Sequence, residues 1–172
     1  MAEAKKTHLS VQKNDTATLE SIVFSWWASL EHDRGARAEL RRATSPAAVI
    51  FAPAYHALLR RIREENLSID REYLAVIAAV VSQVKRHSLV SLPRQLAASA
   101  PGGSRARFSG LRFRRLLAID DLVELQVALI RVVRHLDGAV NIGDVTRAIR
   151  FWNDKTKKDW AFAYYEAAPK ED

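Results

Sequence analysis

Apolar residues recur at steps of three and four through most of this chain, a spacing that predicts amphipathic helices. The first apolar stripe runs from near Thr16 to Leu30, and either Thr16 or Thr18 is placed to act as its N-cap. Gly35 marks a break after this stripe. Residues 36–43 then follow as a short, Arg-rich helix.

Local start signals mark the next three helices. Ser45 followed by Pro46 opens a short helix, and Pro53 resets the chain into a longer one. Asp70 caps the next helix, which we expect to run to about His87. This helix is apolar nearly all round, so it should occupy the centre of a helical bundle.

The second half of the chain continues in the same way after a stretch that is rich in glycine. Residues 100–110 contain Pro101, Gly102, Gly103 and Gly110, which makes them the best linker or mobile loop in the chain. The other helices predicted here are a short one at 93–99, a short basic one at 111–119, a long one that begins after Asp121 and ends at Gly138, one that begins at Asn141, and a last one around Trp160.

Strand signals are poor throughout, with no Asn-Gly or Asp-Gly hairpin and no sustained alternation of apolar and polar residues. We therefore predict an all-α fold of two packed helical bundles, with about eight to nine helices, joined by the Gly-rich loop. The predicted division is a flexible N-terminal tail at 1–15, an N-terminal helical lobe at 16–99, a basic Gly-rich loop at 100–110 and a C-terminal helical lobe at 111–168.

Composition limits the number of domains, the kinds of cross-link or metal site and the location that we expect for this chain. Its 172 residues suffice for one domain or two small lobes, and it has no cysteine, which excludes a disulfide framework and a thiolate metal site. The N-terminus has no apolar signal core, and the longest apolar run, residues 73–81, is too short to span a bilayer. We therefore expect a cytoplasmic protein with no membrane contact.

The chain offers little catalytic chemistry. None of its five histidines pairs with another at helical spacing, and no HExxH, Walker-type loop or GxGxxG is present. Asp120 and Asp121 adjoin, but neighbours on a helix point about 100° apart, and a helix start explains both. We predict no catalytic residue, no metal and no cofactor.

The charge pattern is the most informative feature. The chain has 27 Lys and Arg against 20 Asp and Glu, a net charge of +7, and 19 of the 27 cations are Arg. The guanidinium fork suits phosphate, although a GC-rich genome would also write Arg for Lys. The 47 residues between Glu72 and Asp120 contain no acid at all. This acid-free window holds Lys85, Arg86, Arg94, Arg105, Arg107, Arg112, Arg114 and Arg115, which need phosphate, or acids from elsewhere, as partners.

A second group of arginines precedes this window. Arg34, Arg37 and Arg41 share one helix face, and Arg42 flanks them. On a later helix, Arg131 and Arg134 form an i, i+3 pair that could extend the basic face. The tryptophans lie on apolar stripes and are interpreted as core or interface residues, so backbone contact without base readout is the expected mode of binding.

An ordered set of short patterns resembles the CasB family, the small subunits of type I-E CRISPR Cascade surveillance complexes. In the N-terminal half the patterns are Trp26-Trp27-x-x-Leu30, Arg34-Gly35-x-Arg37-Ala38-x-Leu40-Arg41-Arg42-Ala43, Ser45-Pro46 and Pro53-x-Tyr55-x-x-Leu58. In the C-terminal half they are Arg107-Phe108, Leu111-Arg112-Phe113-Arg114-Arg115-Leu116-Leu117, Val140-Asn141-Ile142, Trp152 and Trp160-x-x-x-Tyr164-Tyr165. The resemblance covers about residues 16–166.

This resemblance implies an all-helical, non-enzymatic subunit. It implies two copies along the belly of the complex, against the crRNA-bearing backbone subunits and the large subunit, with basic faces that hold the crRNA–target DNA region and the displaced strand. The residues in matching segments that would contact nucleic acid are Arg34, Arg37, Arg41, Arg42, Arg107, Arg112, Arg114 and Arg115. A secondary set comprises Lys85, Arg86, Arg94, Arg105, Arg131 and Arg134.

Two other functions stay open on the residues alone. The chain could be a stand-alone DNA-binding regulator, with Val140 to Trp152 as a recognition helix that carries Arg147 and Arg150. It could also be a protein adaptor whose arginines meet acidic partners. A sequence-specific footprint of the isolated protein would favour the first, and failure to bind any nucleic acid even in a complex would favour the second.

Overall fold

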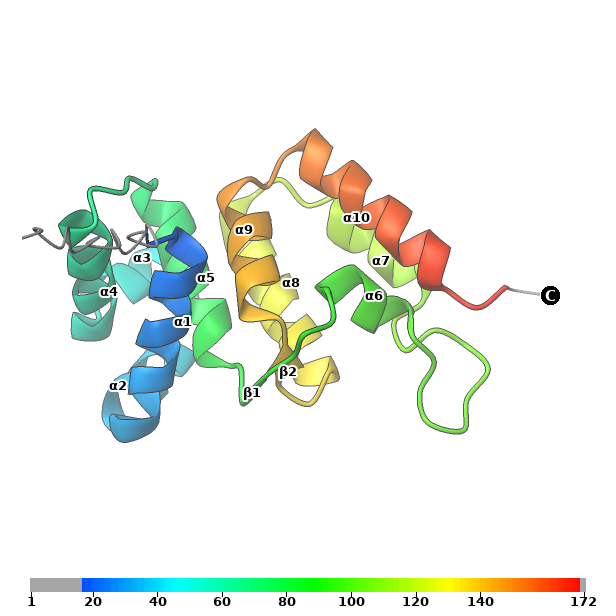
Figure 1. Cartoon of the computed structure of the whole chain (residues 1–172), viewed down its shortest axis with the longest axis horizontal. Coiled ribbons are helices and arrows are strands. Elements are labelled where there is room, and N and C mark those ends of the chain that lie inside the picture. Colours follow the sequence, from blue (N-terminus) through cyan, green and yellow to red (C-terminus); the bar gives the residue numbers. More distant parts are fainter. Residues whose placement is uncertain (1–16, 171–172) are drawn as a thin grey trace, which may run out of the picture.

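The computed structural model describes residues 17–170, which fold almost entirely into helices (Figure 1). The elements are α1 (Leu19–Ser29), the 3-10 helix η1 (Leu30–His32), α2 (Arg34–Arg42), α3 (Pro46–Ile50), α4 (Pro53–Glu64), α5 (Arg71–Ser82), β1 (Arg86–His87), α6 (Leu92–Ala97), α7 (Gly110–Leu117), α8 (Leu122–His135), β2 (Ala139–Val140), α9 (Ile142–Arg150) and α10 (Asp154–Ala167). The all-α prediction is confirmed. The predicted tail at 1–15 and the candidate cap Thr16 lie outside the described residues.

Side-chain caps start most of these helices where the sequence predicts them. Thr18 is the N-cap of α1, since its hydroxyl accepts the backbone N–H of Ser21 at 3.2 Å. The side chains of Ser45, Asp121 and Asn141 cap α3, α8 and α9 in the same way. Each cap satisfies a backbone N–H that has no partner within its helix.

The predicted break at Gly35 is wrong. Gly35 is the second residue of α2, because the Asp33 carboxylate accepts the backbone N–H of Ala36 at 2.9 Å and so starts the helix earlier. The turn between α1 and α2 is instead made by η1, three residues of tighter helix that precede Asp33.

The predicted end of α5 near His87 is also wrong, because the helix ends at Ser82. Beyond this point the backbone N–H groups of Lys85 and Arg86 donate to the carbonyl of Gly138, at 2.8 and 3.1 Å. The chain then pairs in parallel with β2, which makes a two-stranded sheet of two residues each. A contact with a segment 50 residues away therefore ends the helix.

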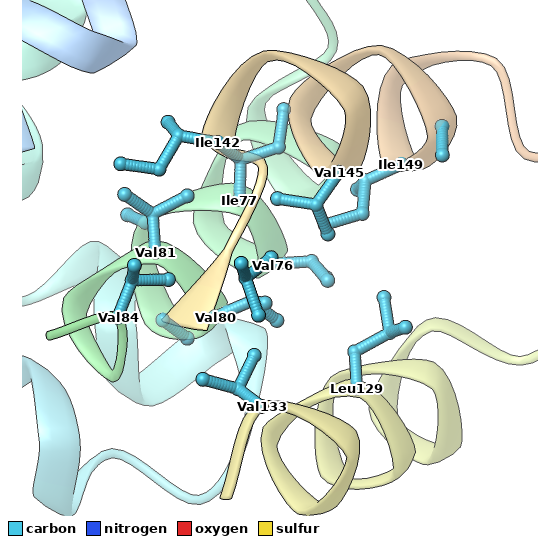
Figure 2. Packing of buried hydrophobic residues seen from close by; sticks show 14 of the residues in the cluster. Val76, Ile77, Val80, Val81, Val84, Leu129, Val133, Ile142, Val145 and Ile149 are labelled. Carbon is cyan, nitrogen blue, oxygen red and sulfur yellow. The ribbon is translucent and has the colours of Figure 1, made fainter. Parts of the chain in front are cut away.

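The central position predicted for the helix after Asp70 is confirmed. Every residue of α5 from Leu74 to Ser82 is buried. α5 packs against α2 and α3 on one side and against α8 and α9 on the other. Figure 2 shows Val76 and Val80 of α5 among side chains such as Val133 of α8 and Val145 of α9.

The helices are arranged along one long axis, with α1 to α4 at one end and α6, α7 and α10 at the other (Figure 1). The buried apolar residues form one cluster that runs through both ends. The predicted division at 100–110 stays a prediction, and α6, which we assigned to the N-terminal lobe, packs against α10. The Gly-rich loop closes on itself, since Arg107 N–H donates to the Ala98 carbonyl at 2.8 Å and Ser99 bridges Ala106.

Candidate nucleic-acid interface

Two arginines of α2 reach the C-terminal end of α5. Arg37 donates through Nε to the Ser82 carbonyl at 3.2 Å and through its terminal amino group to the Val84 carbonyl. Arg41 donates through Nε to the same Ser82 carbonyl at 2.9 Å. The last carbonyls of a helix have no partner within it and carry its negative dipole end, so both cations suit this position. These arginines therefore have a structural role, which the sequence did not reveal.

A third arginine, from α8, lies close to this pair. The pKa of Arg41 is lowered by burial and, after that, by the positive charges of Arg37 and Arg134. Arginine stays protonated in proteins, so the smaller, electrostatic part of this shift indicates a repulsion between cations, and none of the three forms an ion pair with a carboxylate within residues 17–170. A bound anion would relieve it.

The position of α8 explains why Arg134 lies there. The buried Gln126 of α8 donates through Nε2 to the Ala43 carbonyl at the end of α2, at 3.2 Å, which ties the two helices together. Two turns further along α8, Arg134 lies close enough to Arg41 for the two charges to repel each other. Arg131 precedes it by three residues, and both side chains are exposed.

Arg131 also belongs to a group with two arginines of α7. α7 starts at the cap Ser109 and anchors its inner face through the buried Phe113 and Leu116. This leaves Arg112 and Arg115 exposed. Together with Arg131 they line a cavity of about 360 Å³ between α7 and α8, whose other walls are Phe108, Leu116, Ile119, Ala128, Val132 and His135.

The two groups of arginines meet on α8, which carries Arg134 of the first group and Arg131 of the second. We call their six members the basic strip: Arg37, Arg41 and Arg134, then Arg131, Arg112 and Arg115. Within residues 17–170, none of the six forms an ion pair with a carboxylate. The strip thus presents six positive charges without internal neutralisation.

Other predicted cations are neutralised within the chain. Arg94 pairs with Glu166 at 2.6 Å, and Arg107 lies 3.7 Å from Asp137. Both acids come from outside the acid-free window. The remaining predicted residues form no ion pair in the described chain, and no hydrogen bond or shared cavity groups their side chains with the strip: Arg34, Arg42, Lys85, Arg86, Arg105 and Arg114.

The helix proposed for sequence-specific reading has its cations engaged. The apolar side of α9 is buried against α1 and α5. Arg147 pairs with Glu20 of α1 at 3.1 Å, and Arg150 donates to the Ser68 carbonyl at 3.3 Å. Both cations of α9 thus have a partner within the chain, which weakens the case for α9 as a recognition helix.

Over residues 17–170, no three His, Asp or Glu side chains are placed so that they share a metal ion. In the same stretch, no helix has the length and apolarity that crossing a membrane requires. The predicted absence of catalytic residues and cofactors stays a prediction.

The chain is similar to a known family in sequence and to a solved structure in fold. Residues 36–165 match the family model of the CRISPR-associated protein Cse2. The fold also matches a chain in the crystal structure of E. coli Cascade bound to a PAM-containing dsDNA target, with a TM-score of 0.66, 22% identity and coverage of 84% of this chain and 93% of that chain. No curated protein sequence matches significantly. Because the family model spans most of its length, the chain belongs to the Cse2 (CasB) family of type I-E Cascade small subunits, as its sequence patterns predicted.

Proposed function

We propose that this Cse2-family chain is a non-catalytic subunit that stabilises crRNA-guided binding of target DNA, through contacts of the basic strip with nucleic-acid backbone, the displaced strand included. The observation that carries the proposal is the strip itself, six arginines from α2, α7 and α8 without an internal carboxylate partner. In this proposal the partners are crRNA, target DNA, the backbone and large Cascade subunits and a second copy of the chain.

The energetics favour such a role for a protein without sequence readout. Opening a DNA duplex against a guide RNA exchanges one duplex for another of similar stability, so a few backbone contacts tip the balance. Each arginine that binds a phosphate releases condensed counterions, which makes the contact favourable and dependent on salt. The repulsion that lowers the Arg41 pKa is relieved by the same phosphate.

The test uses two neighbouring members of the strip on α8. The side chains of Arg131 and Arg134 are exposed and make no hydrogen bond within the described chain, whereas those of Arg37 and Arg41 bind the end of α5. The double variant Arg131→Gln/Arg134→Gln should assemble normally. Loss of two phosphate contacts should reduce the log–log salt slope of target-DNA binding by about 1.4 to 1.8.

The matched control is Arg60→Gln/Arg63→Gln on α4, an exposed pair with the same i, i+3 spacing outside the strip. This control should leave the salt slope unchanged. Both variants are compared in the reconstituted complex, by filter binding of labelled target DNA over a range of salt. If the Arg131→Gln/Arg134→Gln complex keeps the wild-type affinity and slope, the proposed function fails. If the chain assembles but contacts no nucleic acid even in the complex, the protein adaptor is favoured.

A further inference from the structure

The cavity between α7 and α8 combines two kinds of surface. Its walls are apolar and include Phe108, Leu116 and Val132. Its other lining consists of the guanidinium groups of Arg112, Arg115 and Arg131 together with His135. Its volume of about 360 Å³ lies at the lower end of the range for sites that bind small organic groups. Backbone binding alone requires only the cations and leaves the apolar hollow without a role.

Two contacts of His135 hold the Phe108 wall of this cavity in place. The ring of His135 packs edge-on against Phe108, with centroids 5.6 Å apart at 71°. His135 also donates through Nε2 to the Arg107 carbonyl at 2.6 Å, which fixes the segment that carries Phe108. An aromatic ring in a fixed apolar hollow is a suitable surface for a flat aromatic ligand.

A flat apolar group attached to phosphates describes a nucleotide. Duplex DNA keeps its bases stacked inside, so only a single strand can place a base into such a hollow. We propose that the α7–α8 cavity holds one unstacked base of single-stranded nucleic acid, while Arg112, Arg115 and Arg131 bind the phosphates on either side. This inference rests on the proposed function and names the strand form that the strip binds.

No Asn, Gln, Asp or Glu lines the cavity, so no side-chain amide or carboxylate pairs with the edge of a base. In this proposal the three guanidinium groups bind phosphates, and Nε2 of His135 is already bonded to the Arg107 carbonyl, so we expect little preference for the identity of the base. A backbone that carries no base gains nothing from the hollow and binds through the arginines alone.

The experiment compares two single strands of about twelve nucleotides, one of deoxythymidylate and one in which every base is absent, so that their charge is the same. Binding of the full chain is followed by fluorescence anisotropy at low salt. The deoxythymidylate strand should bind about tenfold more tightly, the effect of one base in contact with an aromatic ring. Both strands should lose affinity with salt, since both bind the strip.

Filling the hollow gives the decisive variant. Ala128→Leu places a larger side chain in the cavity, and should abolish the preference for the strand with bases while leaving the affinity for the abasic strand unchanged. The control is Ala57→Leu, the same change in a separate cavity that is lined by Asp33 and Glu39. If Ala128→Leu lowers the melting temperature, Ala128→Met serves instead, because its unbranched side chain adapts to irregular gaps.

Equal affinities of the two strands for the wild-type chain would overturn the proposal. A preference that survives in folded Ala128→Leu or Ala128→Met would overturn it as well. The experiments distinguish failure of this inference from failure of the proposed function. If only this inference fails, the abasic strand still binds with a steep salt dependence. If the proposed function fails, neither strand binds in this way, and the complex with Arg131→Gln/Arg134→Gln keeps its affinity for DNA.

Discussion

Gly138, between α8 and β2, offers a sharp test of how the two strands meet. Its φ is 78°, and its N–H closes α8 by donating to the Val133 carbonyl at 2.9 Å. A Cβ added there would lie 2.7 Å from Cγ and 3.0 Å from Cβ of Lys85, closer than atoms of this kind approach. The glycine cannot move away freely, because its carbonyl accepts the N–H groups of both Lys85 and Arg86.

The structure separates the two costs of Gly138→Ala. A residue with a Cβ in the left-handed region loses about 1–2 kcal/mol, and overpacking adds about 1–3 kcal/mol. We expect Gly138→Ala to lower the free energy of unfolding by roughly 2–5 kcal/mol. Gly102 has a similar φ of 76° with nothing within 4 Å of its added Cβ. Gly102→Ala should therefore lose only about 1–2 kcal/mol, the backbone cost alone.

Urea unfolding followed by circular dichroism measures both variants, with the midpoint and slope fitted together. Adding Lys85→Ala to Gly138→Ala removes Cγ and Cδ of the lysine, and should recover most of the difference between the two glycine variants. Equal losses for Gly138→Ala and Gly102→Ala, or no recovery with Lys85→Ala, would refute the close approach of Lys85 to Gly138.

Three further predictions concern single side chains. Burial raises the pKa of Asp144, more than the N–H at the start of α6 and a neighbouring arginine lower it, so its ionised form costs stability as pH rises above 3.8. The melting temperature of Asp144→Asn, relative to wild type, should therefore rise as the pH increases from below to above this ordinary carboxyl pKa, and a difference independent of pH would contradict this. The Trp152 indole donates to the Ile119 carbonyl, which accepts no other hydrogen bond within the described chain, so Trp152→Phe leaves that carbonyl without a partner. The Trp27 indole donates to the Val84 carbonyl, which also accepts Arg37. We expect Trp152→Phe to lower the free energy of unfolding by about 1 kcal/mol more than Trp27→Phe does, measured by urea unfolding. Arg41→Ala should lower the unfolding free energy by about 1 kcal/mol, because it removes a charged hydrogen-bond donor from the Ser82 carbonyl, which keeps only Arg37. Arg131→Ala should change it by less than about 0.5 kcal/mol, and equal effects in the same assay would contradict the contact of Arg41.

Helix starts could be predicted from the sequence because a cap is local. Ser45, Asp121 and Asn141 each bind a backbone N–H three residues ahead, and this spacing is visible in the chain. The end of α5 could not be predicted, since it depends on two arginines of α2 and on the carbonyl of Gly138. Val84 keeps the apolar spacing just past Ser82, and no Gly or Pro marks the end of the helix there.

The cations of the candidate interface were visible in the sequence, but their grouping was not. A window without acids correctly marked Arg112 and Arg115 as lacking local partners, yet the acids that pair with Arg94 and Arg107 come from outside it. Arg131 entered only as an extension of a basic face, although it lines the same cavity as the α7 arginines. An i, i+3 spacing shows that two side chains share a face, and it does not show which helix lies opposite.

α5 belongs to both ends of the molecule at once. α2 and α3 cover one side of it and α8 and α9 cover the other, so its residues from Leu74 to Ser82 are all buried. A protease that cleaves the Gly-rich loop would sever the polypeptide without separating the pieces, because parting them would strip this helix on one side.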